Sequence, residues 1–337
     1  MTDKTPVSLK QLAKMAGVST ATVSRVINDN GRFSEDTREK VLALIKKTGY
    51  VPNIAAKALR TRTARAVGLV IPDIANEFFS LIVDSMGKFF FDSDYSLFVC
   101  NTCESLDKNR AQIRNLLGKG VDGLIYISRF PLDARDIPVP VVYLDRVTGE
   151  SDGCSMVSSD NHQGGRLAAR ALLDAGTRKP AMLCAPEDLD GLSTISGRIA
   201  GFAEVMRENG VKWSRKDIVV TRMSVPEARR NVARAFKRNR RFDGLFSTLD
   251  LGAIGAIFGL EDAGLRVPRD VNVVGFDDIS FCEYCKPALT TVRQDTVALA
   301  NTAARMLFSD MENRAARGRH VQVPVTLVVR DSTRRAK

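Results

Sequence analysis

The sequence predicts a small all-α helix-turn-helix domain followed by an α/β core of two doubly wound subdomains. Three observations support this prediction. The first fifty residues contain three short amphipathic segments separated by glycine-containing turns. From residue 66 onward, short apolar runs alternate with helical patterns, as in parallel sheets that are covered by helices. The alternation starts a second time after residue 160, which indicates two similar halves.

Length and composition exclude several classes of protein. The chain has 337 residues, enough for two or three domains, and its 44% apolar content can fill globular cores. No stretch reaches 18 consecutive apolar residues and no signal-peptide pattern is present, so we expect neither a membrane span nor export. Six cysteines without an export signal favour reduced thiols and a cytoplasmic location.

The positive charge is concentrated at the beginning of the chain. Residues 1–65 hold 13 Lys and Arg against 5 Asp and Glu, a net charge of +8, whereas the remaining 272 hold 37 against 34, a net charge of +3. A basic small domain next to a nearly neutral large one favours nucleic acid as the partner of the small domain. A basic face that only improves solubility is the alternative.

Three short helices account for residues 1–50. Ser8 and Gln11 match a capping box at the start of the first helix, which Gly17 ends. Ser19 caps the second helix and Ser34 caps the third. Their expected inward-facing residues are Leu9, Leu12, Ala13 and Ala16 in the first helix, Val23, Val26 and Ile27 in the second, and Val41, Leu44 and Ile45 in the third.

The second helix has small side chains on its exposed face. The second helix of a helix-turn-helix enters the DNA major groove, and small side chains allow a close approach. Hydroxyl groups can contact phosphates or bases, Ala21 can contact a thymine methyl, and Arg25 can contact guanine. An ordinary three-helix bundle is the alternative. The expected DNA-contacting residues are Ser19, Thr20, Ala21, Thr22, Ser24, Arg25 and Asn28.

Residues 51–65 predict a hinge segment. Asn53 can cap a basic helix that is too short to be stable alone, so it would form on docking to DNA. Leu59 could then wedge between base pairs from the minor groove, with Ala56 and Arg60 beside it. A flexible basic linker is the alternative.

Three stretches carry a family resemblance: SLKQLAKMAGVSTATVSRVIN, SEDTREKVLALIKKTGYVPNIAAKAL and VGLVIPDIANEFF. They strongly resemble the LacI/GalR family of bacterial transcriptional regulators, and the resemblance runs from about residue 8 to about residue 331. It implies that Thr20, Ala21 and Arg25 read bases, that Leu59 is the intercalating hinge leucine, and that Arg60 lies near the minor groove.

The resemblance also implies a periplasmic-binding-protein-like core whose hinge is crossed three times, the last two near Gln294 and Val323. The expected domains are a DNA-binding domain at 1–50, a hinge at 51–65 and an effector-binding and dimerisation core at 66–337. The N-subdomain would span about 66–162 and 295–322, and the C-subdomain about 163–292 and 323–337. Apolar runs at 66–71, 95–100, 122–127 and 139–145 predict buried parallel strands in the N-subdomain.

Ligands of doubly wound sheets bind beyond the carboxyl ends of the strands, so residues at those ends are candidates. Asn76, Phe78 and Phe79 follow the first strand, and Asp145 with Arg146 follows the fourth. Aromatic faces stack on sugars or nucleobases, and a carboxylate beside a guanidinium suits vicinal hydroxyls. Each residue alone also has a structural explanation as core, ion pair or hinge. The resemblance adds the effector-contact positions Arg198, Asp250, Asp277 and Gln294.

One position departs from the family pattern. Leu249 precedes Asp250 where the family commonly has Asn, so a polar ligand would lack one hydrogen-bond partner there or a less polar ligand would be accepted. This places a simple pentose or hexose in doubt.

Other signals are weak. The pairs Cys100/Cys103 and Cys282/Cys285 could bind zinc or sense redox state, but ordinary thiols explain them better. The chain has two histidines, His162 and His320, and neither lies in a catalytic motif, so we expect no enzymatic activity and no cofactor.

The sequence therefore predicts a homodimeric, ligand-responsive repressor of a carbohydrate uptake or catabolic operon that binds a pseudo-palindromic double-stranded DNA operator. The effector would be a sugar or sugar derivative. Alternatives within the family are a nucleoside, a purine or a protein partner. A solute-binding protein and an enzyme on the same scaffold are the rivals from other classes. Tetrameric family members carry an extra C-terminal heptad helix, and the absence of that repeat here predicts a dimer.

Overall fold

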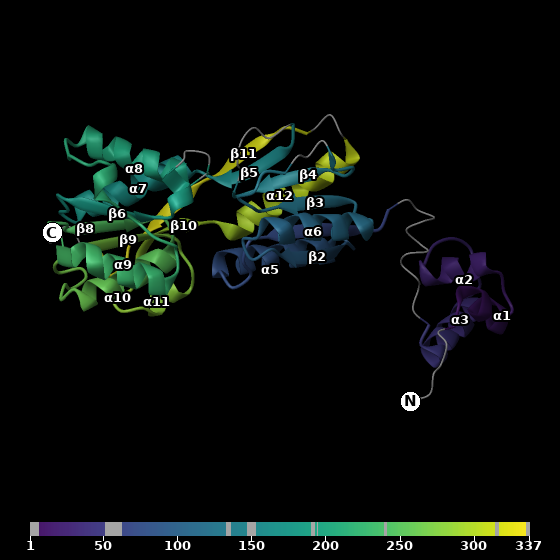
Figure 1. Ribbon diagram of the computed structural model, residues 1–337. Coiled ribbons are helices and arrows are strands. Elements are labelled where there is room, and N and C mark those ends of the chain that lie inside the picture. Colours follow the sequence, from purple (N-terminus) through teal and green to yellow (C-terminus); the bar gives the residue numbers. More distant parts are fainter. Residues whose placement is uncertain are drawn as a thin grey trace. The chain divides into compact units, whose positions relative to one another are not determined.

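The computed structural model describes residues 7–50, 63–132, 136–146, 153–189, 193, 195–238, 241–313 and 317–334. The chain divides into two compact units, Met1–Ala64 and Arg65–Lys337. Figure 1 shows the first unit as helices and the second as two sheets with helices on both faces. The predicted fold class, an all-α domain followed by two α/β subdomains, is confirmed.

The first unit consists of helices α1 (Leu9–Ala16), α2 (Thr20–Ile27) and α3 (Glu35–Thr48). The capping box is present: the backbone N–H of Ser8 donates to Gln11 Oε1 (2.8 Å), and the N–H of Gln11 donates to Ser8 Oγ (3.3 Å). Gly17 ends α1 with φ +70°, a left-handed conformation that glycine adopts without a steric penalty. The core of the unit contains Leu12, Ala13, Ala16, Val23, Val26 and Val41, as predicted.

The N-subdomain of the second unit contains a six-stranded sheet in the order β11-β5-β4-β3-β1-β2. Its strands are β1 (Ala66–Ile71), β2 (Ser96–Asn101), β3 (Gly123–Tyr126), β4 (Val141–Leu144), β5 (Ser155–Ser159) and β11 (His320–Val323). Helices α5 (Glu77–Asp92) and α12 (Thr296–Glu312) cover one face, and their apolar residues join Val67, Leu69 and Ile71 in one core. Gly68 points to the other face, toward Leu116 of α6 (Leu106–Gly118).

The C-subdomain contains a second six-stranded sheet, in the order β12-β10-β9-β8-β6-β7. Helices α7 (Asn161–Asp174) and α8 (Ser196–Glu208) cover one face, and α9 (Val225–Arg238) and α10 (Asp250–Asp262) cover the other. The short segments η2 (Pro186–Leu189), η3 (Arg215–Asp217) and α11 (Phe281–Tyr284) lie in the connections. The strands are β6 (Pro180–Cys184), β7 (Ile218–Val220), β8 (Gly244–Ser247), β9 (Asn272–Asp277), β10 (Thr290–Gln294) and β12 (Val325–Val328).

Helices α7 and α8 approach each other through glycine. A Cβ atom at Gly165 would overlap the backbone carbonyl of Arg198, and one at Gly201 would overlap the carbonyl of His162. Only glycine permits this backbone contact, which fixes the start of α8 against α7. The backbone position of Arg198 is therefore set by helix packing.

The chain passes between the two sheets three times: between β5 and α7, between β10 and α12, and between β11 and β12. The second passage follows Gln294 and the third follows Val323. The N–H of Asp160, in the first passage, donates to the carbonyl of Val323 (2.9 Å), so two of the passages are directly hydrogen-bonded.

Two sequence-based expectations differ from the structure. The buried strand predicted at 95–100 is instead an edge strand, β2, in which Phe98 is 38% and Val99 is 41% exposed. An apolar run has the same sequence pattern whether the chain itself or a second molecule covers it. The sequence also gave no clear signal for β5, β11 or β12, each of which is only four or five residues long. In the described part of the chain, no helix is long and apolar enough to cross a membrane.

Candidate DNA-binding helix and ligand cleft

Helix α2 begins with a capped first turn. The N–H of Thr22 donates to Ser19 Oγ (3.1 Å), and the Ser19 and Thr22 hydroxyl groups share a further hydrogen bond (2.9 Å). Ser19 therefore has a structural function as an N-cap in addition to any contact with DNA. The amide of Asn28 donates to the carbonyl of Ser24 (2.6 Å) at the other end of the helix.

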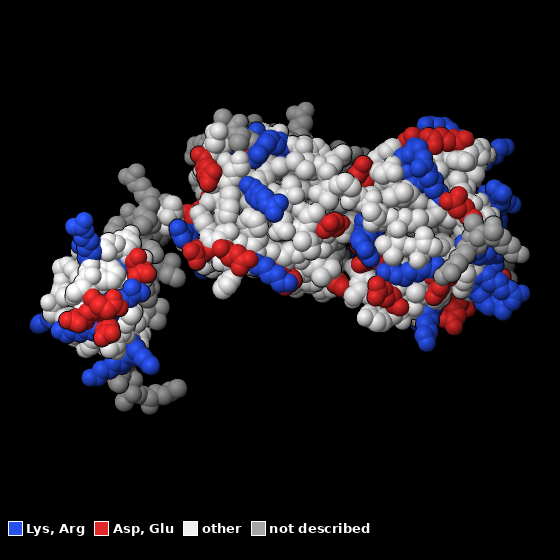
Figure 2. Space-filling view, turned by 180° about the vertical axis from the view of Figure 1, so that it is seen from behind, with Lys and Arg blue, Asp and Glu red and all other residues white. Residues whose placement is uncertain are grey.

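The exposed face of α2 contains several of the predicted DNA-contacting residues. Ala21, Arg25 and Asn28 are exposed at spacings of four and three residues, which places them on one face of the helix, and Thr20 is exposed beside them. Val23 and Val26 are buried on the opposite face. Figure 2 shows acidic side chains among the basic ones on one face of this unit, so its positive charge is not gathered into a single patch there. The predicted hinge residues Asn53, Ala56, Leu59 and Arg60 lie outside the described residues.

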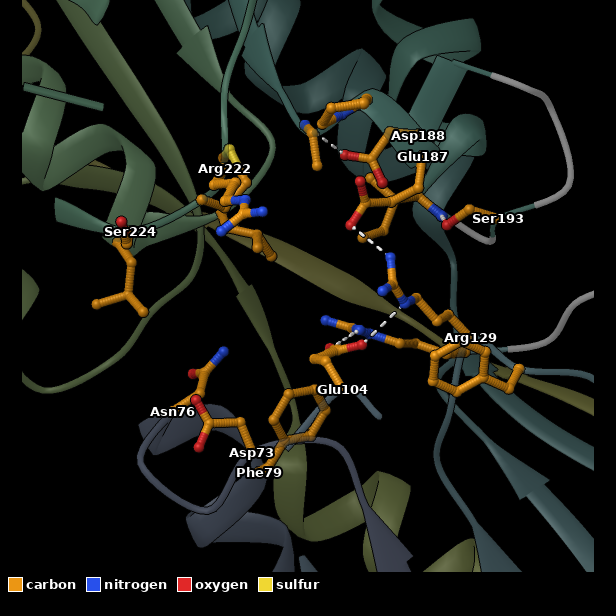
Figure 3. Close-up of a pocket in the computed structure, with 18 of the residues that line it drawn as sticks. Asp73, Asn76, Phe79, Glu104, Arg129, Glu187, Asp188, Ser193, Arg222 and Ser224 are labelled. Carbon is orange, nitrogen blue, oxygen red and sulfur yellow. Dashed lines mark hydrogen bonds and ion pairs between the residues drawn. The ribbon is translucent and has the colours of Figure 1, made fainter. Parts of the chain in front are cut away.

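A cavity of about 1370 Å³ lies between the two subdomains of the second unit. Figure 3 shows the labelled side chains around an open space, with Glu187 and Asp188 opposite Asp73 and Phe79. A small hollow shares Asn76, Phe79, Arg146, Ile195 and Leu249 with this cavity and forms its floor. The floor brings together most of the predicted ligand-binding residues: Asn76, Phe78, Phe79, Asp145, Arg146, Arg198, Asp277 and Gln294.

Arg198 is the centre of the floor. It is 1% exposed; its Nε donates to Asn161 Oδ1 (2.7 Å) and its Nη1 donates to the carbonyl of Thr248 (2.6 Å). Its guanidinium lies over the ring of Phe276, 3.5 Å from the centroid. Burial lowers the pKa of Arg198, and the carboxyl groups of Asp277, Asp145 and Asp188 act in the opposite direction. One buried guanidinium therefore faces three acidic residues.

Asp277 and Gln294 form a second polar pair on the floor. Gln294 Nε2 donates to Asp277 Oδ1 (2.7 Å), and Arg198 Nη1 lies 3.7 Å from the same oxygen. Burial holds the pKa of Asp277 well above its ordinary value, although Arg198 partly opposes this. The backbone of Asp277 has φ +126°, a strained conformation for a residue with a side chain. Gln294 Oε1 is buried and accepts no hydrogen bond from the described residues.

Asp145 and Arg146 close the N-subdomain side of the floor. Asp145 is 5% exposed with φ +62°, and burial raises the pKa of its carboxyl group against the opposing effects of Arg198 and Arg146. The Arg146 guanidinium lies over the ring of Phe79 (5.2 Å), and its Nη1 pairs with Glu104 Oε1 (2.6 Å). Asp145 and Asp277 thus both have a positive φ at the end of a strand that borders the floor.

Asn76, Phe78 and Phe79 lie at the start of α5. Asn76 Oδ1 accepts the N–H of Phe78 (3.1 Å) and so caps the helix. Phe78 and Phe79 are 3% and 2% exposed, and their rings meet edge to face at 5.2 Å. Each aromatic ring therefore contributes to the core of the N-subdomain as well as to the edge of the cleft.

Asp250 differs from the other candidates. It does not line the cavity or its floor; its carboxylate is fully buried and accepts hydrogen bonds from Thr291 Oγ1 (2.6 Å), the N–H of Ile279 (3.1 Å) and Cys282 Sγ (3.1 Å). These bonds join α10 to the loop after β9 and to β10. The observed contacts of Asp250 are thus structural, and the preceding residue, Leu249, lines the cleft in its place.

Sequence reasoning missed an ionic chain across the cleft. Glu104 pairs with Arg146 and with Arg129 Nε (3.1 Å), and Arg129 Nη1 pairs with Glu187 Oε1 of the opposite subdomain (3.2 Å). The dashed lines of Figure 3 trace these contacts. A second link joins Glu77 to Ser280, whose N–H and Oγ donate to its carboxylate at 2.9 and 3.0 Å. No local motif reveals such pairs, because their partners lie 58 and 203 residues apart.

The cysteines show no metal-binding arrangement. Cys100 and Cys103 belong to the N-subdomain, and Cys282 and Cys285 belong to the C-subdomain. Burial raises the pKa of Cys282, which keeps its thiol protonated. Within the described ranges, no group of three or more His, Cys, Asp or Glu residues is arranged to hold a metal ion.

Comparison with known proteins gives a consistent result. Residues 8–53 match the model of the bacterial regulatory proteins of the lacI family, and residues 169–333 match a periplasmic binding protein-like domain. The chain is 34% identical to a ribose operon repressor of Halalkalibacterium halodurans, with 97% of each chain covered. It is 31% identical to the HTH-type transcriptional repressor PurR of Klebsiella pneumoniae, with 96% of each covered.

A solved structure extends the likeness to three dimensions. The crystal structure of the lac repressor dimer bound to operator and the anti-inducer ONPF has a TM-score of 0.86 and 27% sequence identity, covering 98% of this chain and all of that one. The helix-turn-helix unit, the two-subdomain cleft and the likeness to repressors over nearly the full length lead to one conclusion. The chain belongs to the LacI family of bacterial transcriptional regulators.

Proposed function

We propose that this chain is a homodimeric, cytoplasmic repressor that binds an operator through α2 and responds to a small polar effector in the cleft. One observation carries the proposal: the same chain has an exposed recognition helix and a cleft whose floor is made of buried, mutually paired charged groups. The chain is a ligand-responsive transcriptional regulator and not an enzyme. The related ribose operon repressor supports control of a carbohydrate operon.

DNA recognition in this proposal uses two copies of the chain. Residues 1–50 of each copy read one half of a pseudo-palindromic operator, and residues 51–65 contact the minor groove at its centre. Ala21 and Arg25 face base edges, while Ser19, Thr20 and Asn28 contact phosphates or bases. The dimer is supported by the lac repressor dimer, to which the chain is similar, and by the exposed apolar residues of β2.

Effector binding connects the two subdomains. Hydroxyl groups of the effector contact Asp145, Arg198, Asp277 and Gln294, and its ring contacts Phe79. Both subdomains line the cleft, and the pairs Arg129–Glu187 and Glu77–Ser280 join them across it. An effector that contacts both sides therefore changes the relative stability of the possible arrangements of the subdomains. Coupling between two sites of this kind is typically about 1–3 kcal/mol.

A nonsugar effector is the second candidate. The Arg146 guanidinium stacked on Phe79 offers a flat face to a nucleobase, and the related repressor PurR supports a purine class of effector. The residues on the cleft floor have donors and acceptors for either ligand. A direct comparison of sugars with nucleosides and purines separates the two candidates.

The test begins with selection of an operator from random or genomic fragments, followed by fluorescence anisotropy titrations at several salt concentrations. We expect specific binding whose log–log salt slope is about −0.9 for each phosphate neutralised. Pentoses, hexoses, disaccharides, nucleosides and purines are then added. At least one should shift operator affinity, and Arg198→Ala should remove the shift. Absence of DNA binding at every salt concentration contradicts the proposal.

The hinge has its own test. Leu59→Ala should weaken binding to the selected operator by at least tenfold, because the wedge acts only where the minor groove is opened at a specific site. Binding to a random duplex should change little. An equal loss on both DNAs in parallel anisotropy titrations would contradict the wedge.

A further inference from the structure

Where the cavity meets its floor, the C-subdomain contributes two aliphatic side chains, Ile195 and Leu249, whereas polar and charged residues such as Ser193, Arg222 and Glu227 line other parts of the same wall. Ile195, Met223, Leu249 and Leu251 line the cavity from that side, together with Ala185 and Pro186. Ile195 is 7% exposed, and Leu249 and Met223 are half-buried. No aromatic side chain lines the cavity from the C-subdomain among the described residues, whereas Phe79 and Phe130 line it from the N-subdomain.

Leu249 occupies a position where helix stability favours another residue. It is the N-cap of α10 and makes no side-chain capping hydrogen bond. Ser, Thr, Asp and Asn are the residues that stabilise this position, and leucine is among the least favourable. Leu249 therefore leaves the start of α10 without a side-chain cap, and its side chain lines the cleft instead.

Leu249 also lies next to the hydrogen-bonding groups of the floor. The carbonyl of the preceding residue, Thr248, accepts a hydrogen bond from Arg198 (2.6 Å), and Leu249 lines the floor together with Asp277 and Gln294. Gln294 Oε1, on a residue that is 3% exposed, is available as an acceptor. A ligand at this place therefore meets hydrogen-bonding groups on one edge and aliphatic carbon on the other.

A hydroxyl group placed against Leu249 and Ile195 would lose its hydrogen bonds to water without gaining new ones, which is unfavourable. A methyl group at the same place would be buried against carbon. We propose that the effector is a deoxysugar, such as a 6-deoxyhexose, whose hydroxyls bind the floor and whose methyl group packs against Ile195, Met223 and Leu249. This inference rests on the proposed function and names the class of its effector.

The experiment uses the full-length protein and matched pairs of sugars. Isothermal titration calorimetry compares L-rhamnose with L-mannose, L-fucose with L-galactose, 6-deoxy-D-glucose with D-glucose, and 5-deoxy-D-ribose with D-ribose. We expect one deoxysugar to bind at least tenfold more tightly than its hydroxylated partner, because one methyl-sized group in a hydrophobic pocket changes affinity about 10- to 200-fold. Leu249→Asn should abolish or reverse that preference.

Leu42→Asn is the matched control, because Leu42 is exposed on α3 in the other unit and should leave sugar affinity unchanged. Thermal melting confirms that both variants are folded; Leu249→Asn replaces an uncapped position with a favoured cap. The inference is overturned if the hydroxylated member of each pair binds as well as the deoxysugar, if no pair member binds, or if Leu249→Asn keeps the preference. Operator binding measured on the same preparation shows whether the proposed function survives that result.

Discussion

Helix α2 and the floor of the cleft, which we propose as the sites for DNA and effector, are built in opposite ways. Helix α2 presents exposed, mostly small side chains and one arginine. The cleft floor buries Arg198, Asp145 and Asp277, with strained backbone at both aspartates and raised pKa values of both carboxyl groups. DNA is charged and hydrated, so a helix that binds it can stay exposed to water, and its affinity for DNA should depend on salt concentration. A neutral ligand needs a site that is dry and prearranged, and the raised pKa values of its buried carboxyl groups predict that binding there depends on pH.

The largest effect that tests this contrast is expected at the floor. Arg198→Ala removes the guanidinium that faces Asp145, Asp188 and Asp277, so we expect effector affinity to fall by more than 100-fold in isothermal titration calorimetry. The free energy of unfolding should also fall, by roughly 3–5 kcal/mol, because breaking a buried ion pair leaves uncompensated charge.

Arg229→Ala is the matched surface variant. Its guanidinium makes two hydrogen bonds to Asp262, at 2.7 and 2.8 Å, but it is half-exposed, so its loss should change stability far less than the loss of Arg198. Arg198→Lys keeps the positive charge but removes the planar guanidinium, so it distinguishes the contributions of the two. If Arg198→Ala were folded and bound the effector with wild-type affinity, the assignment of the floor as the binding site would be wrong.

The next largest effect is expected at α2. Arg25→Ala should lower affinity for the selected operator by a factor of about 5 to 150 and relax specificity at one base pair, because a base contact is typically worth about 1–3 kcal/mol. Anisotropy titrations against single-base operator variants measure both effects. Arg38→Ala, whose guanidinium pairs with Asp29 (3.0 Å), is the control. If affinity fell equally for all DNAs, and the log–log salt slope became smaller by about one, Arg25 would be assigned to a phosphate contact instead.

The cross-cleft link should have a smaller effect. Arg129→Ala and Glu187→Gln each remove the contact between the subdomains (3.2 Å), so we expect each to reduce the effect of the effector on operator affinity by less than about fivefold. Both side chains are partly exposed, which limits the energy of the pair. In a double-mutant cycle, the double variant should show the same loss of effector response as either single variant, because each removes the same contact. Fully additive losses would show that the two residues act independently.

The smallest effect concerns pH. Burial raises the pKa values of Asp277 and Asp145, whereas an unfolded aspartate titrates near about 3.9. Over the interval between these values the folded carboxyl groups hold protons that the unfolded chain releases, so stability should fall as pH rises. Ligand hydroxyls that donate to these carboxylates favour the ionised form, so effector affinity should rise with pH across the same interval.

Calorimetry in buffers of different ionisation enthalpy measures the protons released on binding. Asp277→Asn should remove most of that release and flatten the dependence of the melting temperature on pH. A release of protons that is the same in Asp277→Asn and in the wild type would place the titrating group elsewhere.

Local signals in the sequence were sufficient for much of this architecture. The capping residues Ser8, Ser19 and Ser34 start helices where the sequence predicts them, since a cap depends on residues only three positions apart. The strands at 66–71 and 122–127 were predictable because both are buried on two faces. Most residues of the floor were also predictable, because they follow predicted strands and ligands of doubly wound sheets bind beyond the strand ends.

What the sequence did not reveal depends on distant contacts. The side chain of Asp250 points to Thr291, Ile279 and Cys282, and no pattern around residue 250 indicates which face of the helix start is occupied. The exposure of Phe98 depends on β2 being an edge strand, which is a property of strand order. The link from Arg129 to Glu187 exists only after both subdomains have folded.

The three passages between the subdomains have a mechanical consequence. Gln294 and Val325 are register partners in the antiparallel pair β10–β12, and Asp160 is bonded to Val323, so the passages are held together as a short torsion element. We expect these links to resist sliding of one subdomain past the other while permitting twisting and bending. A cut in the peptide backbone at any single passage would therefore leave the two subdomains connected by the other two. The movement of the subdomains on effector binding would still be a rotation of one relative to the other.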